Sequence, residues 1–173
     1  MFLRRIGSDF VGVNFLVGRA CFELGMYQQS LPWFVLATAE DGVNVSAWVF
    51  RARAAVKSEV FVEALTCYRH LLDMAGDSDS NIVEEAESNI DAMPMRAIKM
   101  ARKLCDEAQY DDAWDLTQFV LAEDQDNAFA VKLQDKILRA LRDDLLAVGE
   151  DDLGTRVQLA RSIYSKDASN AFA

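Results

Sequence analysis

Residues that interrupt helices are scarce in this chain, which has only 8 glycines and 2 prolines among its 173 residues. A fold of short strands joined by tight turns uses glycine and proline far more often. Alanine, leucine, arginine and glutamate, which favour helices, are abundant instead. The composition therefore predicts an all-α protein, and the length is sufficient for a continuous core.

Residues of metal and nucleophilic sites are scarce as well. Cys21, Cys67 and Cys105 lie 46 and 38 residues apart, and His70 is the only histidine. This spacing fits no metal site, and an odd number of cysteines argues against a disulfide framework. We expect no catalytic residue, no metal and no cofactor, so the chain is interpreted as non-enzymatic. The thiols are expected on apolar helix faces, as small core residues.

Long apolar runs and a surplus of positive charge are also missing. No stretch approaches the roughly 18 apolar residues that a membrane span needs. Asp9 and Asn14 interrupt the apolar segment that follows the N-terminal arginines, which argues against an export signal. We therefore expect a cytoplasmic protein with no membrane partner. The net charge of −10 argues against a nucleic-acid partner, because phosphates require a basic face.

A pattern that repeats after 34 residues is present. Two copies of the pattern share five positions. These are a small residue (Gly18/Ala52), an aromatic (Tyr27/Phe61), a second small residue (Ser30/Ala64), a second aromatic (Phe34/Tyr68) and an apolar residue (Ala37/Leu71). A third copy contains Ala101, Tyr110, Ala113 and Val120, and Tyr110 follows Phe61 by 49 residues, which is 34 plus an insertion of 15. Such a period is typical of helical repeats, which must stack on one another to bury their apolar faces.

These residues, together with Trp48, resemble the tetratricopeptide repeat, a helix–turn–helix unit. The resemblance implies a right-handed superhelical stack of antiparallel helix pairs. It covers a single domain over 1–173, with repeats at about 11–44, 45–78 and 94–127, an insertion at 79–93 and a degenerate fourth pair at 128–167.

The local signals define where the helices are expected. Ser8 or Asp9 is a plausible cap for a first helix that ends near Leu24. Further helices are expected at about 27–39, 45–56, 60–74, 82–92, 111–123, 128–148 and 153–165. Pro94 either begins a helix or lies within a long one that continues to residue 108.

The end of the chain echoes an earlier segment. Residues 167–173 (Asp-Ala-Ser-Asn-Ala-Phe-Ala) resemble 124–130 (Asp-Gln-Asp-Asn-Ala-Phe-Ala), which is expected to be a turn that leads into a helix. One interpretation is that the chain is the N-terminal part of a longer protein. The alternative is a chance similarity in a C-terminal tail.

Basic residues are concentrated on the first helix of each expected pair. Arg19, Arg53 and Arg102 each follow the small residue of the pattern, and the family resemblance implies that this position faces a concave groove. Three guanidinium groups could there hold carboxylates in bidentate fashion. The expected partner-binding groove consists of Phe15, Arg19, Phe22, Val49, Arg53, Lys57, Ile98 and Arg102. A second interpretation stays open, in which Arg53 and Arg102 pair with acidic neighbours inside the stack.

The expected function is a non-catalytic protein–protein interaction module or scaffold, bacterial in style, that binds an acidic or amphipathic peptide. One alternative is a helical appendage that scaffolds or dimerises a larger enzyme, such as a bacterial glycosyltransferase. Another is a small acidic secretion chaperone. An apolar end without a cap would also favour a homodimer.

Overall fold

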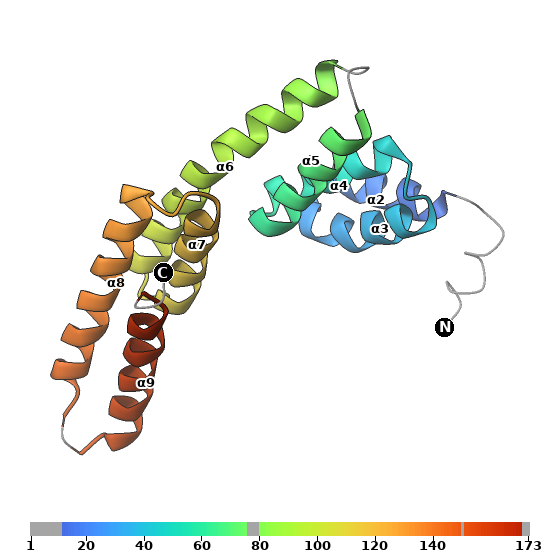
Figure 1. The fold of residues 1–173 in the computed structure, drawn as a ribbon. Helices are drawn as coiled ribbons and strands as arrows, with labels where there is room; N and C mark the ends of the chain where they lie inside the picture. Colours follow the sequence, from blue (N-terminus) through green and yellow to red (C-terminus); the bar gives the residue numbers. More distant parts are fainter. Residues whose placement is uncertain (1–11, 76–79, 150, 171–173) are drawn as a thin grey trace. The chain divides into compact units, whose positions relative to one another are not determined.

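The computed structural model describes residues 12–75, 80–149 and 151–170. These residues form eight α-helices and no strand (Figure 1), which confirms the all-α class. The chain divides into two compact units, Met1–Met93 and Pro94–Ala173, which are described separately below. The first unit ends at the residue where the expected insertion ends.

The first unit contains four complete helices and the beginning of a fifth. Their bounds are α2 Val13–Glu23, α3 Tyr27–Glu40, α4 Val45–Lys57 and α5 Phe61–Ala75, and α6 begins at Ser80. Each helix from α3 to α5 packs on its predecessor. The expected bounds of α3, α4 and α5 agree within a residue at either end. The expected cap at Ser8 or Asp9 lies outside the described residues.

The second unit contains the C-terminal part of α6 (Ser80–Asp106), then α7 Tyr110–Glu123, α8 Ala128–Ala147 and α9 Leu153–Asn170. Helix α8 packs on both α7 and α9. Pro94 lies inside α6, so of the two alternatives the structure has the long helix, which also includes the helix expected at about 82–92.

The expected turn at 167–170 is wrong, because α9 continues to Asn170. Two contacts hold the end of α9 in place: Arg142 on α8 donates to Asp167 at 2.9 Å, and buried Lys166 donates to Asp111 on α7. Residues 171–173 of the echo lie outside the described part of the chain.

Three turns inside the helix pairs have the same backbone structure. In the first turn, the amides of Leu24, Gly25 and Met26 donate to carbonyls four, three and five residues earlier. The same three bonds recur at 58–60 and 107–109. The central residue is left-handed each time, with φ of 77° at Gly25 and 59° at both Glu59 and Ala108. The 34- and 49-residue spacings therefore mark equivalent turns.

Two turns that join successive pairs are also alike. Asp41 and Asp124 end α3 and α7 in extended conformations, and the amide of Asn44 or Asn127 donates back to the preceding aspartate carbonyl. Each asparagine then caps the next helix, since its side chain accepts from a backbone amide at 3.0–3.2 Å.

The core of the first unit is built on the repeated pattern. Phe34 is completely buried, and Gly18 lies against its ring: a Cβ at Gly18 would be 2.9 Å from two ring carbons. Only glycine fits that close approach without a shift. The pattern positions Ala52, Ala64 and Tyr68 are also buried, so the repeated residues are those that join neighbouring helices.

Polar contacts connect α3, α4 and α5. Arg51 on α4 donates to Thr38 Oγ1 on α3 at 2.8 Å and to Glu63 Oε1 on α5 at 2.6 Å. Its guanidinium carbon lies 4.9 Å from the Trp48 ring centre, and that ring lies 4.2 Å from His70. His70 therefore has an inter-helix packing role.

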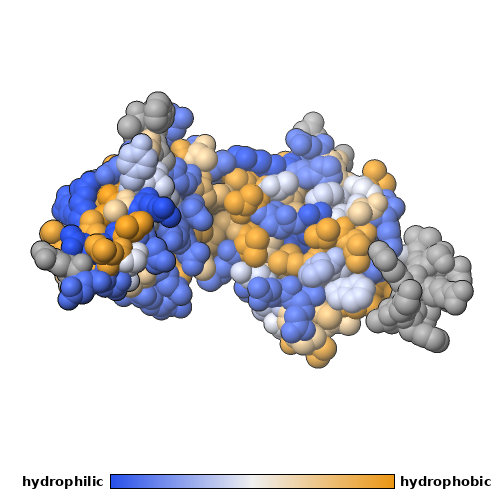
Figure 2. Space-filling view, turned by 90° about the horizontal axis from the view of Figure 1, so that it is seen from below, coloured by the Kyte–Doolittle hydropathy of each residue, from blue (hydrophilic) through white to orange (hydrophobic). Residues whose placement is uncertain are grey.

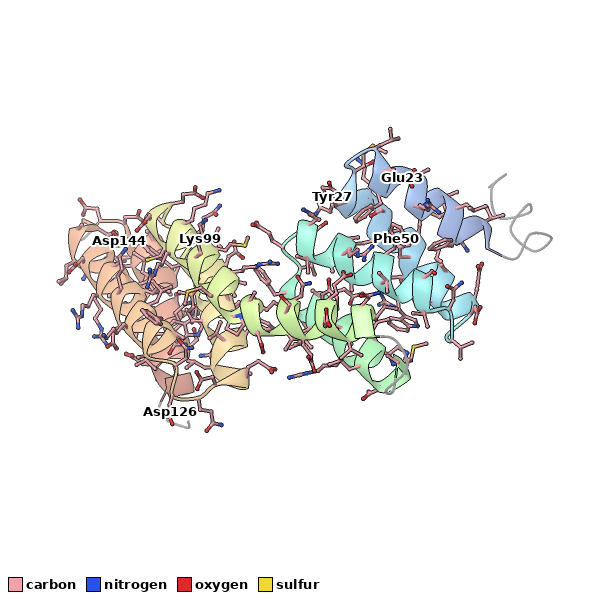
Figure 3. The ribbon with its side chains drawn as sticks, turned by 90° about the horizontal axis from the view of Figure 1, so that it is seen from above. Glu23, Tyr27, Phe50, Lys99, Asp126 and Asp144 are labelled. Carbon is pink, nitrogen blue, oxygen red and sulfur yellow. The ribbon has the colours of Figure 1, made fainter. Side chains whose placement is uncertain are left out.

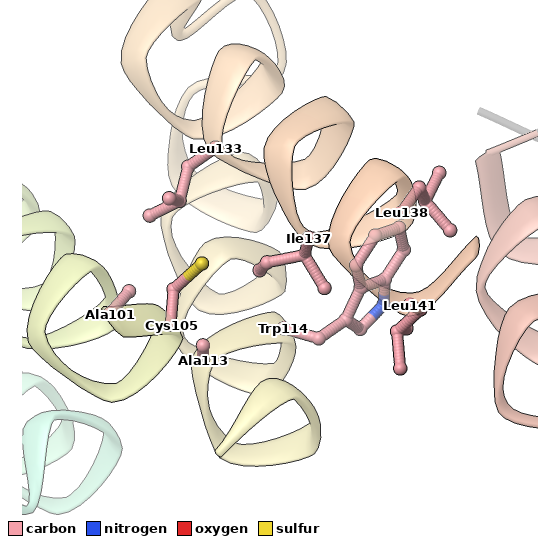
Figure 4. Close-up of a cluster of buried hydrophobic side chains, with 8 residues drawn as sticks. All are labelled: Ala101, Cys105, Ala113, Trp114, Leu133, Ile137, Leu138 and Leu141. Atoms are coloured by element: carbon pink, nitrogen blue, oxygen red, sulfur yellow. The ribbon is translucent and has the colours of Figure 1, made fainter. Parts of the chain in front are cut away.

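The second unit has its own core, formed by α6, α7 and α8 (Figure 4). Its buried members are small or apolar: Ala101, Cys105, Ala113, Trp114, Leu133, Ile137, Leu138 and Leu141. One polar pair is buried beside them, where Gln134 Nε2 of α8 donates to Thr117 Oγ1 of α7 at 3.0 Å. This bond fixes how α7 and α8 align, because a shift would leave the Gln134 amide group buried without this partner, whereas Thr117 Oγ1 keeps its bond to the Trp114 carbonyl.

Candidate functional sites

Aromatic rings form a cluster on α2, α3 and α4 in the first unit. Phe50 of α4 is half-buried, and its ring centre lies 5.7 Å from Phe15, 5.4 Å from Phe22 and 5.8 Å from Phe34. Figure 3 labels Phe50 together with Glu23 and Tyr27, which mark the end of α2 and the start of α3. Phe15 and Phe22 both pack against Phe50, a residue that is not among the expected groove residues.

Arg19 and Arg53 both lie against the Phe50 ring. Their guanidinium carbons are 5.8 Å and 5.9 Å from its centre, a distance at which cation–π attraction operates. Each arginine already has a carboxylate. Arg19 donates to Glu23 at 2.8 Å within an exposed turn of α2, and Arg53 donates to Glu85 of α6 through two bonds of 2.7 Å and 2.5 Å.

The Arg53–Glu85 pair is partly shielded from solvent. The Arg53 hydrogen bonds hold the pKa of Glu85 below its ordinary value, and the Tyr68 hydroxyl adds a weaker contact at 3.4 Å. Glu85 in turn raises the pKa of Arg53. For Arg53, the structure thus agrees with the second interpretation, since its partner is an acidic residue on another helix.

The other expected groove residues lie in several environments. Val49 and Ile98 are core residues, 9% and 2% exposed, so neither presents a side chain to a ligand. Lys57 is exposed and lines a cavity of about 320 Å³ beside the turn between α2 and α3. Arg102 belongs to the second unit.

A pocket in the second unit brings Arg102 together with residues of α8. We call it the α6–α8 pocket; it measures about 240 Å³ and is lined by Arg102, Asp106, Phe129, Lys132, Leu133 and Lys136. Phe129 is 50% exposed, and the Arg102 guanidinium carbon lies 5.6 Å from its ring centre. Buried Leu133 contributes an apolar wall. The pocket combines positive charge with an accessible aromatic ring.

The charges of the α6–α8 pocket are not balanced by its own carboxylate. Lys136 Nζ donates to Asp106 Oδ1 at 2.7 Å, which raises the pKa of Lys136. Arg102 and Lys132 are exposed and form no ion pair with any described residue. Pairing with internal acidic neighbours therefore accounts for Arg53 but not for Arg102.

The expected groove left out three of these residues, although two of them, Lys132 and Lys136, belong to the basic first helix of the fourth expected pair. Phe129, Lys132 and Lys136 are spaced at i, i+3 and i+7, so they lie on one face of α8. An aromatic residue among lysines on an otherwise acidic chain was the available signal. Their approach to Arg102, about 30 residues earlier, depends on how α6 and α8 pack.

Cys67 and Cys105 lack the character of reactive thiols. Burial raises the pKa of Cys67 to about 12, and it also raises the pKa of Cys105. A protonated thiol is a poor nucleophile. Cys21 is half-buried. Within the described ranges, no three His, Cys, Asp or Glu side chains form a group able to hold a metal ion.

Apolar side chains also reach the surface, as the orange patches in Figure 2 show. In the second unit they include Leu146 and Leu153, 83% and 68% exposed, beside a cavity of about 630 Å³ at the turn between α8 and α9. No helix of the described part has both the length and the apolar character needed to cross a membrane.

Comparisons with known proteins do not assign the chain to a family. A scan against protein-family models finds no match, and a search of curated proteins finds no significant match.

Proposed function

We propose that the chain is a non-catalytic interaction module of tetratricopeptide type that binds an acidic, partly apolar peptide segment of another protein. The single observation that carries the proposal is the α6–α8 pocket, where Arg102 and Lys132 have no carboxylate partner among the described residues and flank a half-exposed Phe129 ring. The equivalent turns at Gly25, Glu59 and Ala108 support the repeat assignment.

The two units differ in how ready they are to bind a carboxylate. In the first unit, a ligand has to compete with Glu85 for Arg53 and with Glu23 for Arg19. In the second unit, Arg102 can grip a carboxylate with two parallel bonds while an apolar neighbour packs on Phe129. We therefore place the main contact in the α6–α8 pocket.

The test is a titration of the full chain with the peptide acetyl-Phe-Glu-Phe-amide, in which binding is monitored by the changes in backbone amide chemical shifts in NMR spectra. We expect shifts at Arg102, Phe129 and Lys132. Arg102→Ala should weaken binding by about 1 kcal/mol, roughly fivefold in Kd, because the contact is solvent-exposed. Lys103→Ala is the matched control, since it removes the same charge from an adjacent exposed position. Equal affinity in the Arg102→Ala variant and the wild type would overturn the proposal.

A further inference from the structure

The α6–α8 pocket holds more positive charge than one carboxylate ligand neutralises. Three cations line it, and among the residues that the structure describes only Lys136 of these has a carboxylate partner, Asp106 at 2.7 Å. Arg102 and Lys132 remain, although the chain has 28 acidic residues and only 18 basic ones. Two unpaired cations that share one pocket match a ligand group with two negative charges.

We propose that the pocket binds a phosphorylated serine or threonine that stands next to an apolar residue in a peptide. This inference rests on the proposed function. Such a group carries close to two negative charges at neutral pH and has three acceptor oxygens. The planar fork of Arg102 can engage two oxygens, and the Lys132 ammonium group can engage the third. The neighbouring apolar side chain then packs against Phe129 and Leu133.

The surroundings favour an isolated phosphate over a nucleic-acid backbone. A polyanion is held by a row of cations that follows its phosphates. Here Asp135 lies on the same helix as Lys132, and Asp126 lies in the turn that precedes α8 (Figure 3); both are exposed. Together with Asp106 in the pocket itself, these carboxylates add negative charge along α8 and the turn before it, which disfavours a ligand with several phosphates.

The experiment compares acetyl-Phe-X-Phe-amide peptides in which X is serine, glutamate or phosphoserine, titrated into the full chain by NMR. We expect phosphoserine to bind about three- to tenfold more tightly than glutamate, and serine to bind more weakly than both. The advantage of phosphoserine over glutamate should shrink when the pH falls from about 7.5 to about 5.5, because phosphoserine loses its second charge near pH 6.

A variant of Lys132 tests whether this cation contacts the phosphate group. Lys132→Ala should remove most of the advantage of phosphoserine over glutamate, whereas Arg139→Ala, an exposed change on the same helix, should leave the advantage in place.

Each result decides between the two proposals. Glutamate binding as tightly as phosphoserine overturns the phosphate inference and leaves the peptide-binding function intact. Absence of binding by all three peptides overturns both. A short single-stranded DNA that binds more tightly than phosphoserine, with shifts at the same residues, also overturns the phosphate inference and indicates a nucleic-acid site.

Discussion

Replacing Glu59 by glycine should stabilise the first unit. Glu59 occupies the left-handed position of the turn between α4 and α5, with φ of 59°. A residue with a Cβ pays about 1–2 kcal/mol in that conformation. Glycine avoids this strain but loses about 0.5–1 kcal/mol through the extra freedom of the unfolded chain. The Glu59 side chain is exposed and makes no hydrogen bond or ion pair within the described residues, so its removal costs no contact.

The net expectation for Glu59→Gly is a gain of about 0.5–1 kcal/mol in the free energy of unfolding. Glu59→Ala is the matched control, because it removes the carboxylate but keeps the Cβ and therefore the strain. Gly25→Ala tests the reverse change at the equivalent turn. Apart from the neighbouring residues in the chain, no atom lies within 4 Å of the added Cβ there. We therefore expect Gly25→Ala to lower the free energy of unfolding by as much as Glu59→Gly raises it, through the backbone conformation alone.

The assay is urea unfolding followed by tryptophan fluorescence in a Trp114→Phe background. Trp33 and Trp48 are then the only tryptophans, and both belong to the first unit. A change in midpoint at constant slope gives the change in stability. A Glu59→Gly variant that is no more stable than Glu59→Ala would contradict the prediction, because Glu59 then carries no left-handed strain in solution.

Three further outcomes can be measured on the same protein. Gly18→Ala should destabilise it, because crowding against Phe34 costs about 1–3 kcal/mol and outweighs a helix-propensity gain of about 1 kcal/mol; unchanged urea stability contradicts the close packing. The hydrogen bonds from Arg53 lower the pKa of Glu85 in the folded protein. The ion pair therefore adds to the free energy of unfolding above the unfolded pKa of about 4.3, and this contribution is lost as the pH falls through the lower folded pKa. Glu85→Gln should therefore cost up to about 1 kcal/mol near pH 7 and nothing at low pH; an equal loss in unfolding free energy at both pH values argues against the pair. Cys67, with a pKa of about 12, should resist alkylation near pH 8 until urea is added, and rapid labelling of the native protein would contradict its burial.

Helix positions were predictable where local chemistry decides them. Asp41-Gly42 and Asn127 gave turn and cap signals, and the corresponding helices begin and end close to the expected residues. The 34-residue spacing also identified Gly18 as a small residue of the repeat, and the structure shows that this position lies against the Phe34 ring.

Features that depend on packing were not predictable in the same way. Pro94 could begin a helix or lie within one, and only the structure shows that α6 continues through it. Glu85 is 32 residues from Arg53, so periodicity gave no reason to pair them. The α6–α8 pocket needs two helices side by side, which is why Arg102 was identified without Phe129 or Lys132.

The paired turns at 41–44 and 124–127 have a consequence for engineering. Both connect a helix of 14 residues to the next helix through the same backbone bonds and an asparagine cap. The two four-residue segments therefore share one backbone geometry, to which the Trp48 indole of α4 adds a bond to the Gly42 carbonyl in the first segment. Exchanging these segments, or inserting a helix pair bounded by them, offers a route to lengthened or shortened versions of the protein with the native connections preserved.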